Sequence, residues 1–302
     1  METEFKFMEE FKKVIEASKN IPKEDLLFTY NGVIYPTSIC DVDTFKTMET
    51  FEAREDDLMM VAYPKCGSNW TSSLLHRLLR AAYNKESSSI FPLLEFKAPN
   101  KFEKLKVEPS PRFLGTHLKY DNIPQSFFDK KVKMMVVFRN PKDTAVSLFH
   151  FCNNNPVLPT YNSWDEFFPD FMAGKVVFGS YFDHAVAWNK HLDDDTILLT
   201  IFEDMKEDLE GTIKKISEFY GISITEEQQK QIAEQGTFKS MKENSGKTHG
   251  DYGKIIFRKG EVGDWKNYFS QAQSQEMDAK FDECLAGTKF GEKLKYNVYC
   301  KW

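Results

Sequence analysis

Residues 61–70, VAYPKCGSNW, join an apolar strand pattern to a helical one, and this junction decides the fold. The run DLMMVAYP, 57–64, is apolar up to the break at Pro64, and TSSLLHRLLRAAYN, 71–84, follows with helical spacing. A helix N-terminus leaves backbone N–H groups free, and its dipole favours negative charge. Gly67 lets a ligand approach the backbone closely, and Lys65 adds a positive charge. The junction therefore predicts an anion site between a buried strand and a helix.

The same stretch is compatible with an ordinary strand-to-helix turn that carries an exposed lysine. These ten residues alone do not decide between the two interpretations. They do exclude a Walker A motif, GxxxxGK[ST], because Lys65 precedes Gly67 instead of following the glycines.

Outward from the junction, strand patterns and helix patterns alternate. The expected strands are RFLGTHL at 112–118, KVKMMVVFRN at 131–140 and TILLTIFE at 196–203, with a hairpin at 26–36 that turns at Asn31-Gly32. The expected helices lie around Phe5, Met8, Phe11 and Ile15, after Pro141, and over 205–221, where Gly221 ends the helix. Long loops, typical of lids or binding loops, are expected at 85–112, 153–180 and 239–265.

Strands without alternation, separated by helices, predict an α/β fold. We expect a single domain over residues 1–302, with a central parallel sheet flanked by helices and a P-loop-like strand–loop–helix that binds phosphate. Ligands of such sheets bind at the carboxyl ends of the strands.

Composition limits the classes of function that this chain can have. The formal net charge of −6 gives no basic field for nucleic acid, so local cations must hold any anionic ligand. The five cysteines show no CxxC spacing, which argues against a disulfide framework or a zinc site and fits a reducing compartment. The acidic, amphipathic start does not resemble a signal peptide, and no stretch has the length of a membrane span. These features predict a soluble cytosolic protein that binds neither nucleic acid nor membrane.

Two further stretches carry candidate anion ligands. In FRNPKDTAVS, 138–147, Arg139 ends a buried strand and Ser147 lies about two helical turns further on. The alternative is a surface arginine paired with Asp143 and a serine facing solvent. In FRKGEVGDW, 257–265, two cations precede a glycine, which alone is typical of a solvated basic loop. Together the three stretches could clamp a ligand with more than one phosphate-like group.

These motifs together resemble those of the cytosolic sulfotransferases over nearly the whole chain. YPKCGSNW resembles their loop for the 5′-phosphosulfate of 3′-phosphoadenosine 5′-phosphosulfate (PAPS), FRNPKDTAVSLFHF their 3′-phosphate segment, and RKGEVGDWKNYF their C-terminal nucleotide loop. EDM at 203–205 and TFKSMKEN at 237–244 also match in order and spacing. Within the family the resemblance is to an outlying member such as the 6B subfamily.

The resemblance implies roles for individual residues. His117 in GTHL would be the catalytic base, and Lys65 would stabilise the departing phosphate. Trp70 and Phe238 would lie on opposite sides of adenine, and Arg139, Ser147 and 258–260 would hold the 3′-phosphate. The implied donor-binding residues are Lys65, Cys66, Gly67, Ser68, Asn69, Trp70, Arg139, Ser147, Phe202, Thr237, Phe238, Met241, Arg258, Lys259 and Gly260.

The chemistry suits these residue types. Sulfuryl transfer resembles phosphoryl transfer, so catalysis rests on positioning and electrostatic stabilisation. A histidine, with an ordinary pKa of about 6.5, can accept the acceptor's proton near neutrality. Without its context, a lone histidine such as His117 is more often structural. The transferred group carries less charge than a phosphoryl group, so this logic requires no metal.

The acceptor pocket is expected from the segments 87–96, 152–164 and 248–257. Their apolar and aromatic content suits a small apolar molecule with a hydroxyl or an amine. The alternative is that these aromatic residues are ordinary core under long loops.

Several positions depart from the family pattern. Gly115 replaces a lysine two residues before the base, Phe202 a tyrosine and Gly236 a threonine. The usual dimer segment is degraded at 266–275, where Lys266 remains but Ser270, Gln271 and Gln275 stand in place of a Thr-Val pair and a glutamate. A monomer or a weak homodimer follows. The alternative functions are a protein that binds PAPS or a hydrophobic ligand with little transfer and, more weakly supported, a nucleoside kinase.

Overall fold

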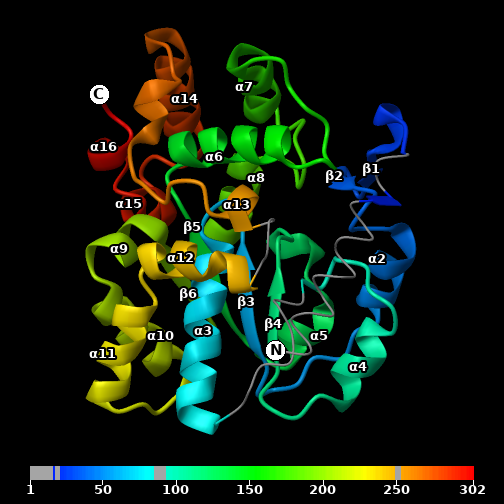
Figure 1. Cartoon of the computed structure of the whole chain (residues 1–302), viewed down its shortest axis with the longest axis vertical. Helices are drawn as coiled ribbons and strands as arrows, with labels where there is room; N and C mark the ends of the chain where they lie inside the picture. The colour runs from blue at the N-terminus through cyan, green and yellow to red at the C-terminus, as the bar shows by residue number, and fades with distance from the viewer. Residues whose placement is uncertain (1–15, 18–20, 85–92, 249–252) are drawn as a thin grey trace.

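The centre of the molecule is a four-stranded parallel sheet (Figure 1), seen in a computed structural model that describes residues 16–17, 21–84, 93–248 and 253–302. The strand order is β4-β3-β5-β6. The strands are β3 (Leu58–Ala62), β4 (Phe113–Thr116), β5 (Lys133–Phe138) and β6 (Ile197–Ile201). The α/β fold and all four expected strands are confirmed. The helix expected around Phe5 to Ile15 lies outside the described residues.

The N-terminal hairpin also forms as expected. Strands β1 (Leu27–Tyr30) and β2 (Val33–Pro36) pair antiparallel. Asn31 and Gly32 have φ angles of 48° and 76°, the positive values that a tight two-residue hairpin turn requires.

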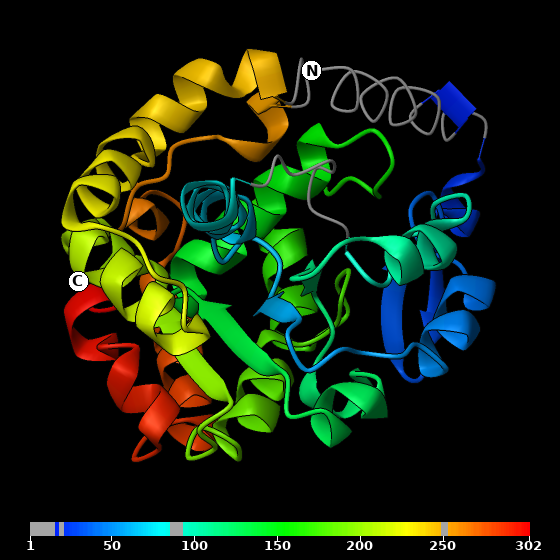
Figure 2. The ribbon, with the colours of Figure 1, turned by 90° about the horizontal axis from the view of Figure 1, so that it is seen from below.

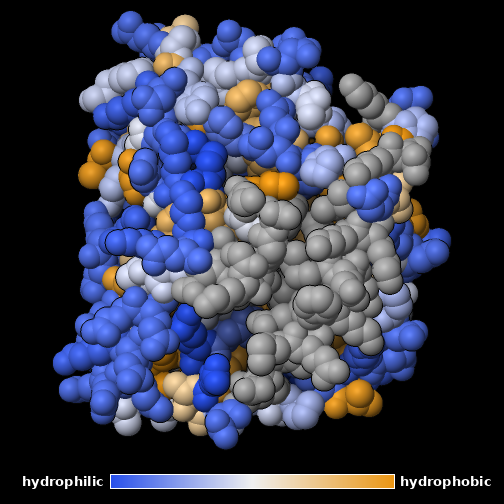
Figure 3. All heavy atoms as spheres, in the orientation of Figure 1, coloured by the Kyte–Doolittle hydropathy of each residue, from blue (hydrophilic) through white to orange (hydrophobic). Residues whose placement is uncertain are grey.

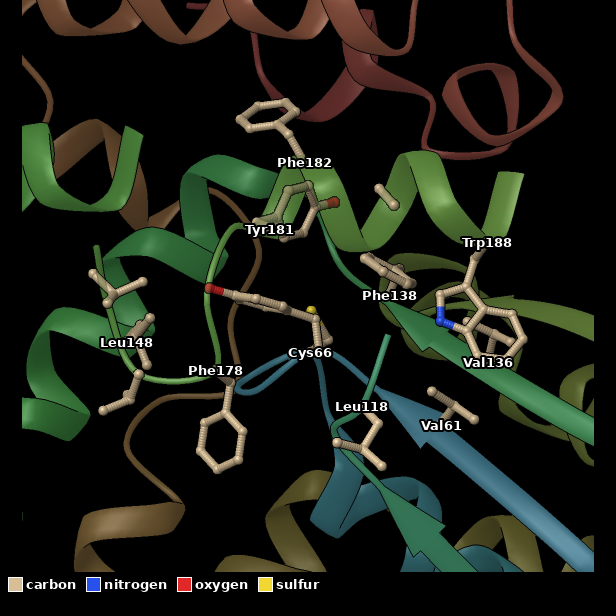
Figure 4. Packing of buried hydrophobic residues seen from close by; sticks show 14 of the residues in the cluster. Val61, Cys66, Leu118, Val136, Phe138, Leu148, Phe178, Tyr181, Phe182 and Trp188 are labelled. Carbon is tan, nitrogen blue, oxygen red and sulfur yellow. The ribbon is translucent and has the colours of Figure 1, made fainter. Parts of the chain in front are cut away.

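The sheet is buried on both faces, because successive side chains of each strand enter different cores. In β3, Met59 and Val61 belong to one apolar cluster, whereas Met60 and Ala62 belong to the other. Figure 2 shows helices on both faces of the sheet, with the β1–β2 hairpin beyond its β4 edge. Figure 4 shows the cluster that contains Val61, in which Tyr181 packs against Phe138 and Trp188 lies beside Val136. This packing fixes the carboxyl ends of the strands, where the candidate site lies.

The helices connect and cover the strands. Before β5 they are α2 (Val42–Glu49), α3 (Ser68–Tyr83), α4 (Lys101–Val107) and α5 (Gln125–Asp129). Between β5 and β6 they are α6 (Pro141–Asn154), α7 (Trp164–Met172) and α8 (Tyr181–Asn189). After β6 they are α9 (Phe202–Glu207), α10 (Leu209–Tyr220), α11 (Glu226–Gln235), α12 (Phe238–Thr248), α13 (Gly253–Ile256), α14 (Gln271–Cys284), α15 (Lys289–Lys293) and α16 (Tyr296–Tyr299). Short 3-10 turns occur at η1 (Lys23–Asp25), η2 (Tyr120–Asn122) and η4 (Asp264–Asn267).

The helix expected over 205–221 is in fact two helices. Asp208 leaves the helical region, with φ −143° and ψ 84°, and its side chain accepts the Gly211 N–H to begin α10. Phe202 and Glu203, which we expected in the strand, begin α9 instead. Gly221 ends α10 with φ 71°, as predicted.

The expected long loops are wrong in part. The range 85–112 contains α4, 153–180 contains α7, and α12, α13 and η4 occupy much of 239–265. Helix α7 begins at the N-cap Ser163, which accepts the Glu166 N–H, and it buries Phe167, Phe168 and Phe171. Of these ranges, 85–92 and 249–252 lie outside the described residues.

The surface viewed in Figure 3 is mostly hydrophilic over α10 and α11, with scattered hydrophobic spots. Among the described residues, no helix has the length and apolarity to cross a bilayer. All five cysteines are free thiols, in agreement with the absence of a CxxC spacing.

Candidate functional site

The turn after β3 has a backbone conformation that lets a ligand approach it closely. Lys65 and Gly67 both have positive φ angles, 69° and 103°. Gly67 is the N-cap of α3 and has no side chain to cap it, and the Thr71 N–H is the first to bond back, to the Gly67 carbonyl. Ser68 and Asn69 open the helix. A Cβ added to Gly67 would lie 2.8 Å from Phe202 Cδ2, so only glycine fits without movement.

The Lys65 ammonium is partly buried within this turn. Its Nζ lies 4.2 Å from the centroid of the Phe151 ring. Burial, and then the nearby Arg139 guanidinium, lower the pKa of Lys65 to about 7. An anion at this position would restore the charged form. Cys66 is buried beside it, with Sγ 3.6 Å from Thr144 Oγ1, and burial raises the pKa of its thiol to about 12.

Arg139 directly follows β5, next to this turn, and is only 6% exposed. Its guanidinium donates to the Glu261 carbonyl at 2.6 Å and lies 4.6 Å from the Phe202 ring centroid. The pairing with Asp143 that the alternative interpretation expected exists at 3.7 Å, but the arginine is not on the surface. Its buried Nε has no partner among the described residues. Ser147 lies further along α6 and is partly buried.

Two carboxylates, Asp264 and Asp143, hold the basic stretch 257–265 in place. Neither was predicted as a site residue. Asp264 binds Arg258 at 2.6 Å and Lys259 at 2.7 Å. Burial alone would raise the pKa of Asp264, but hydrogen bonds from Lys259 and Arg258 lower it to about 2. Asp143 accepts the N–H groups of Gly263 and Trp265, at 2.7 and 3.0 Å. The stretch is therefore fastened to the start of α6 and is not a freely solvated loop.

Aromatic residues also lie close to the turn after β3. The Trp70 indole N–H donates to the Gly236 carbonyl at 2.6 Å, and its ring meets Phe202 edge-on at 5.2 Å. Phe238 begins α12 and packs 6.0 Å from Phe257. Its ring fills the space where a Cβ of Gly260 would stand. Two further predicted residues, Thr237 and Met241, lie here, with the Thr237 hydroxyl accepting the Ser240 N–H and Met241 buried.

His117 lies just after β4, tied to the neighbouring strand. Its Nδ1 is 2.7 Å from the Ala62 carbonyl. Because a carbonyl only accepts, Nδ1 carries the proton and Nε2 keeps its lone pair. Burial lowers the pKa of His117, so the neutral imidazole prevails near neutrality. Since Ala62 ends β3, one strand positions both this imidazole and the Lys65 turn.

Aromatic rings surround His117. Phe96, within a predicted acceptor segment, lies 6.4 Å from its ring. Phe178 is closer, at 5.1 Å, and also contacts Tyr35 at 5.7 Å. Phe178 has a φ of 67°, and its N–H donates to the Ile34 carbonyl. It lies outside the predicted acceptor segments but within the stretch 153–180, which was predicted as a long binding loop.

The site is thus a cationic turn, a buried arginine and a neutral imidazole gathered at the carboxyl ends of β3, β4 and β5. The described residues contain no group of three His, Cys, Asp or Glu side chains that could hold a metal. Such an arrangement can hold an anion beside a neutral proton acceptor.

Comparison with known proteins shows which family the chain belongs to. A family model described as "Sulfotransferase domain" matches residues 55–289. Sulfotransferase 6B1 of Homo sapiens is 51% identical over 297 residues, with 98% of each chain covered. The Danio rerio sulfotransferase 6B1 is 49% identical over 296 residues, covering 97% of this chain and 100% of the relative.

Comparison with solved structures also finds a sulfotransferase. The crystal structure of mouse sulfotransferase SULT7A1 complexed with PAP matches with a TM-score of 0.83 and 35% identity, over 91% of this chain and 99% of that one. Sequence and fold agree, and the chain belongs to the sulfotransferase family, near its 6B members.

Proposed function

We propose that this protein transfers the sulfuryl group from PAPS to a hydroxyl or an amine of a small, largely apolar acceptor, with His117 as general base. The observation that carries the proposal is the Ala62 carbonyl, which fixes the proton on His117 Nδ1 at 2.7 Å and leaves Nε2 free to accept one. Family membership supports the transfer chemistry, and the PAP in the related mouse structure supports the donor.

The donor would bind with one end at the Lys65 turn and the other end at Arg139 and the 258–260 stretch. Lys65 and the first turn of α3, with Ser68 and Asn69, would hold the 5′-phosphosulfate. Trp70, Phe202 and Phe238 would contact adenine. The 3′-phosphate would meet Arg139, whose buried Nε has no partner among the described residues, and Ser147 with the 258–260 stretch.

In the proposed transfer, the attacking oxygen of the acceptor and the leaving oxygen of the donor lie on opposite sides of the sulfur, in line with it. As the acceptor oxygen forms its bond to sulfur, its O–H bond breaks and the proton moves to His117 Nε2. The bond from sulfur to the bridging oxygen breaks, and its electron pair stays on the departing phosphate. Lys65 meets that charge as it develops. Because burial lowers the pKa of Lys65 to about 7, it is above this pH that the bound anion is needed to favour the charged form.

The acceptor would lie between His117 and the rings of Phe96 and Phe178. These rings favour a small apolar body with one nucleophilic group at the imidazole. The five free thiols are typical of a reducing compartment, which supports a cytosolic location.

The test is transfer from radiolabelled PAPS to a panel of phenols, alcohols and amines, with PAP binding measured by calorimetry. We expect His117→Ala to bind PAP within about twofold of the wild type and to lose roughly 10²–10⁴-fold in transfer, the usual contribution of a general base. His191→Ala, remote from this site and stacked on Tyr120, serves as the control. Near wild-type turnover by His117→Ala would overturn the assignment.

A PAPS-binding protein with little transfer is the second candidate, because Gly115 lies where relatives carry a lysine. PAP binding without transfer to any acceptor would favour it. Gly115→Lys then separates a disabled centre, which the lysine would restore, from a missing acceptor, which it would not.

A further inference from the structure

We propose that Glu95 is the positioning and electrostatic partner of His117, stabilising the imidazolium that forms during transfer. The inference rests on the proposed role of His117 as base. It gives a function to a buried carboxylate that lies in the predicted acceptor segment 87–96 but had no role of its own.

Glu95 touches the segment that carries the base. Its side chain is fully buried, at 0% exposure. Oε1 accepts the backbone N–H of His117 at 2.8 Å, and Oε2 accepts the Thr116 hydroxyl at 2.7 Å. Both oxygens act as acceptors, which is the hydrogen bonding of a carboxylate. The carboxylate therefore fixes where the chain leaves β4 and where the imidazole begins.

The turn that holds Glu95 is itself anchored to β4. The Leu94 N–H donates to the Gly115 carbonyl at 2.8 Å, and Leu93 forms a parallel bridge with Gly115. The ammonium of Lys101 donates to the carbonyls of Leu94, Leu93 and Phe96, on either side of Glu95. This cation holds the turn closed while the carboxylate faces the base.

Both direct partners of Glu95 are neutral, a backbone N–H and a hydroxyl. A buried charge costs more solvation than a buried amide, and an amide could also accept from one of these donors. Support for the backbone alone therefore does not account for a carboxylate here. The buried Lys101 ammonium interacts electrostatically with the Glu95 charge. The positive charge that forms on His117 is the second group that this carboxylate stabilises.

Three charged or titratable groups face His117 from the elements around it. Glu95 comes from the turn before α4, Lys65 from the turn after β3, and His184 from α8. Burial lowers the pKa of His117, Glu95 acts to raise it, and Lys65 acts to lower it further. His184 donates from Nε2 to the His117 carbonyl at 3.2 Å, and burial lowers its pKa to about 3, so it adds no charge. Glu95 is thus the charged group that favours the imidazolium, and the hydrogen bond to the Ala62 carbonyl acts in the same direction.

The test compares Glu95→Gln, which removes the charge at nearly constant shape, with Thr116→Val, which removes one hydrogen bond and keeps the charge. Two readouts are needed: the pH profile of kcat/KM for transfer, and the titration of the His117 ring followed by NMR without turnover. PAP in the NMR buffer favours the folded state by mass action. Glu95→Asp, which keeps the charge but withdraws it by one methylene, is the third variant.

Removing the charge lowers the pKa of His117, so neutral imidazole persists to lower pH. For Glu95→Gln we expect the acid limb of kcat/KM and the NMR midpoint to move together to lower pH, by about one unit. Plateau transfer should fall roughly tenfold, the equivalent of that shift, because the imidazolium loses its stabilisation. Thr116→Val should leave both midpoints in place, and Glu95→Asp should lie between wild type and Glu95→Gln.

Equal loss of transfer in Glu95→Gln and Thr116→Val, with unmoved midpoints, would overturn the proposal and leave Glu95 a structural residue. If Glu95→Gln yields no folded protein, Glu95→Asp decides: midpoints equal to those of Thr116→Val would overturn it as well. The failure of His117 as base shows differently, as transfer that survives His117→Ala.

Discussion

At the scale of single residues, Lys65 shows how the fold prepares a cation for an anion. Its burial, and then repulsion from the Arg139 guanidinium, lower its pKa to about 7 from an ordinary value near 10.5. Below that pH the free protein already carries the charge. Above it, the free lysine is neutral, and an anionic ligand raises its pKa and draws a proton from solvent.

We therefore expect PAP binding at pH 8 to take up a proton, and the uptake to fade as the pH falls below 7. The phosphates of PAP, with a second pKa of about 6, are already ionised at pH 8. Calorimetry in buffers of different ionisation enthalpy measures the uptake. Lys65→Met should abolish it and Lys259→Met should keep it, because a hydrogen bond to Asp264 raises the pKa of Lys259. Heats independent of the buffer in the wild type would contradict this account.

The residues of the site differed in how far the sequence could reveal them. Lys65, Arg139 and His117 lie within short motifs or at strand ends, where local patterns indicate function. Asp143, Glu95 and Phe178 act through contacts with residues distant in the chain, such as Gly263 for Asp143. No local pattern encodes such a contact, because it depends on how the elements pack.

At the scale of elements, the start of α3 depends on the turn that precedes it. Gly67 combines a φ of 103° with a ring, Phe202, that leaves no room for a Cβ. Gly221 at the end of α10 has a φ of 71° and open space around its Cβ position. The two glycines thus share one backbone requirement but differ in packing.

This pair gives a matched experiment. Gly67→Ala and Gly221→Ala should each lower the free energy of unfolding, by about 1 kcal/mol or more, since both place alanine at positive φ. Gly67→Ala alone should weaken PAP binding, by roughly tenfold or more, because Phe202 and the α3 N-terminus must shift. Urea denaturation and calorimetry measure the two effects. Wild-type PAP affinity in Gly67→Ala would argue against the turn as the phosphosulfate site.

Elements were predictable where their burial pattern is simple. The apolar runs of β3 and β5 indicated strands because both faces of the sheet are covered. Helix α7 was expected as loop, since Pro169 lies inside it and the helix is short. The break between α9 and α10 was hidden because Asp208 caps the second helix in place, which a continuous helical pattern does not reveal.

At the scale of the whole molecule, the degraded dimer segment is used within the chain. Ser270 caps α14 together with Gln273. The Gln273 amide also donates to Asp165 at 2.8 Å and accepts the Trp164 indole N–H at 3.0 Å. These contacts fasten the segment to α7 of the same chain.

We therefore expect a monomer, with light scattering giving the mass of one chain, 35.2 kDa, at micromolar concentration. Restoring the family pattern with Ser270→Thr, Gln271→Val and Gln275→Glu should shift the population towards twice that mass. A wild-type dimer at micromolar concentration would show that another surface joins the chains.

The strand order has a consequence for how such proteins diversify. Lys65 and Arg139, which we propose bind the donor, follow the inner strands β3 and β5, each of which pairs with strands on both sides. His117, the proposed base, follows β4 at the edge of the sheet. Substitutions on an edge disturb fewer partners than substitutions in the middle. A lineage can therefore exchange the molecules it modifies while inheriting one unchanged way of holding the activated sulfate.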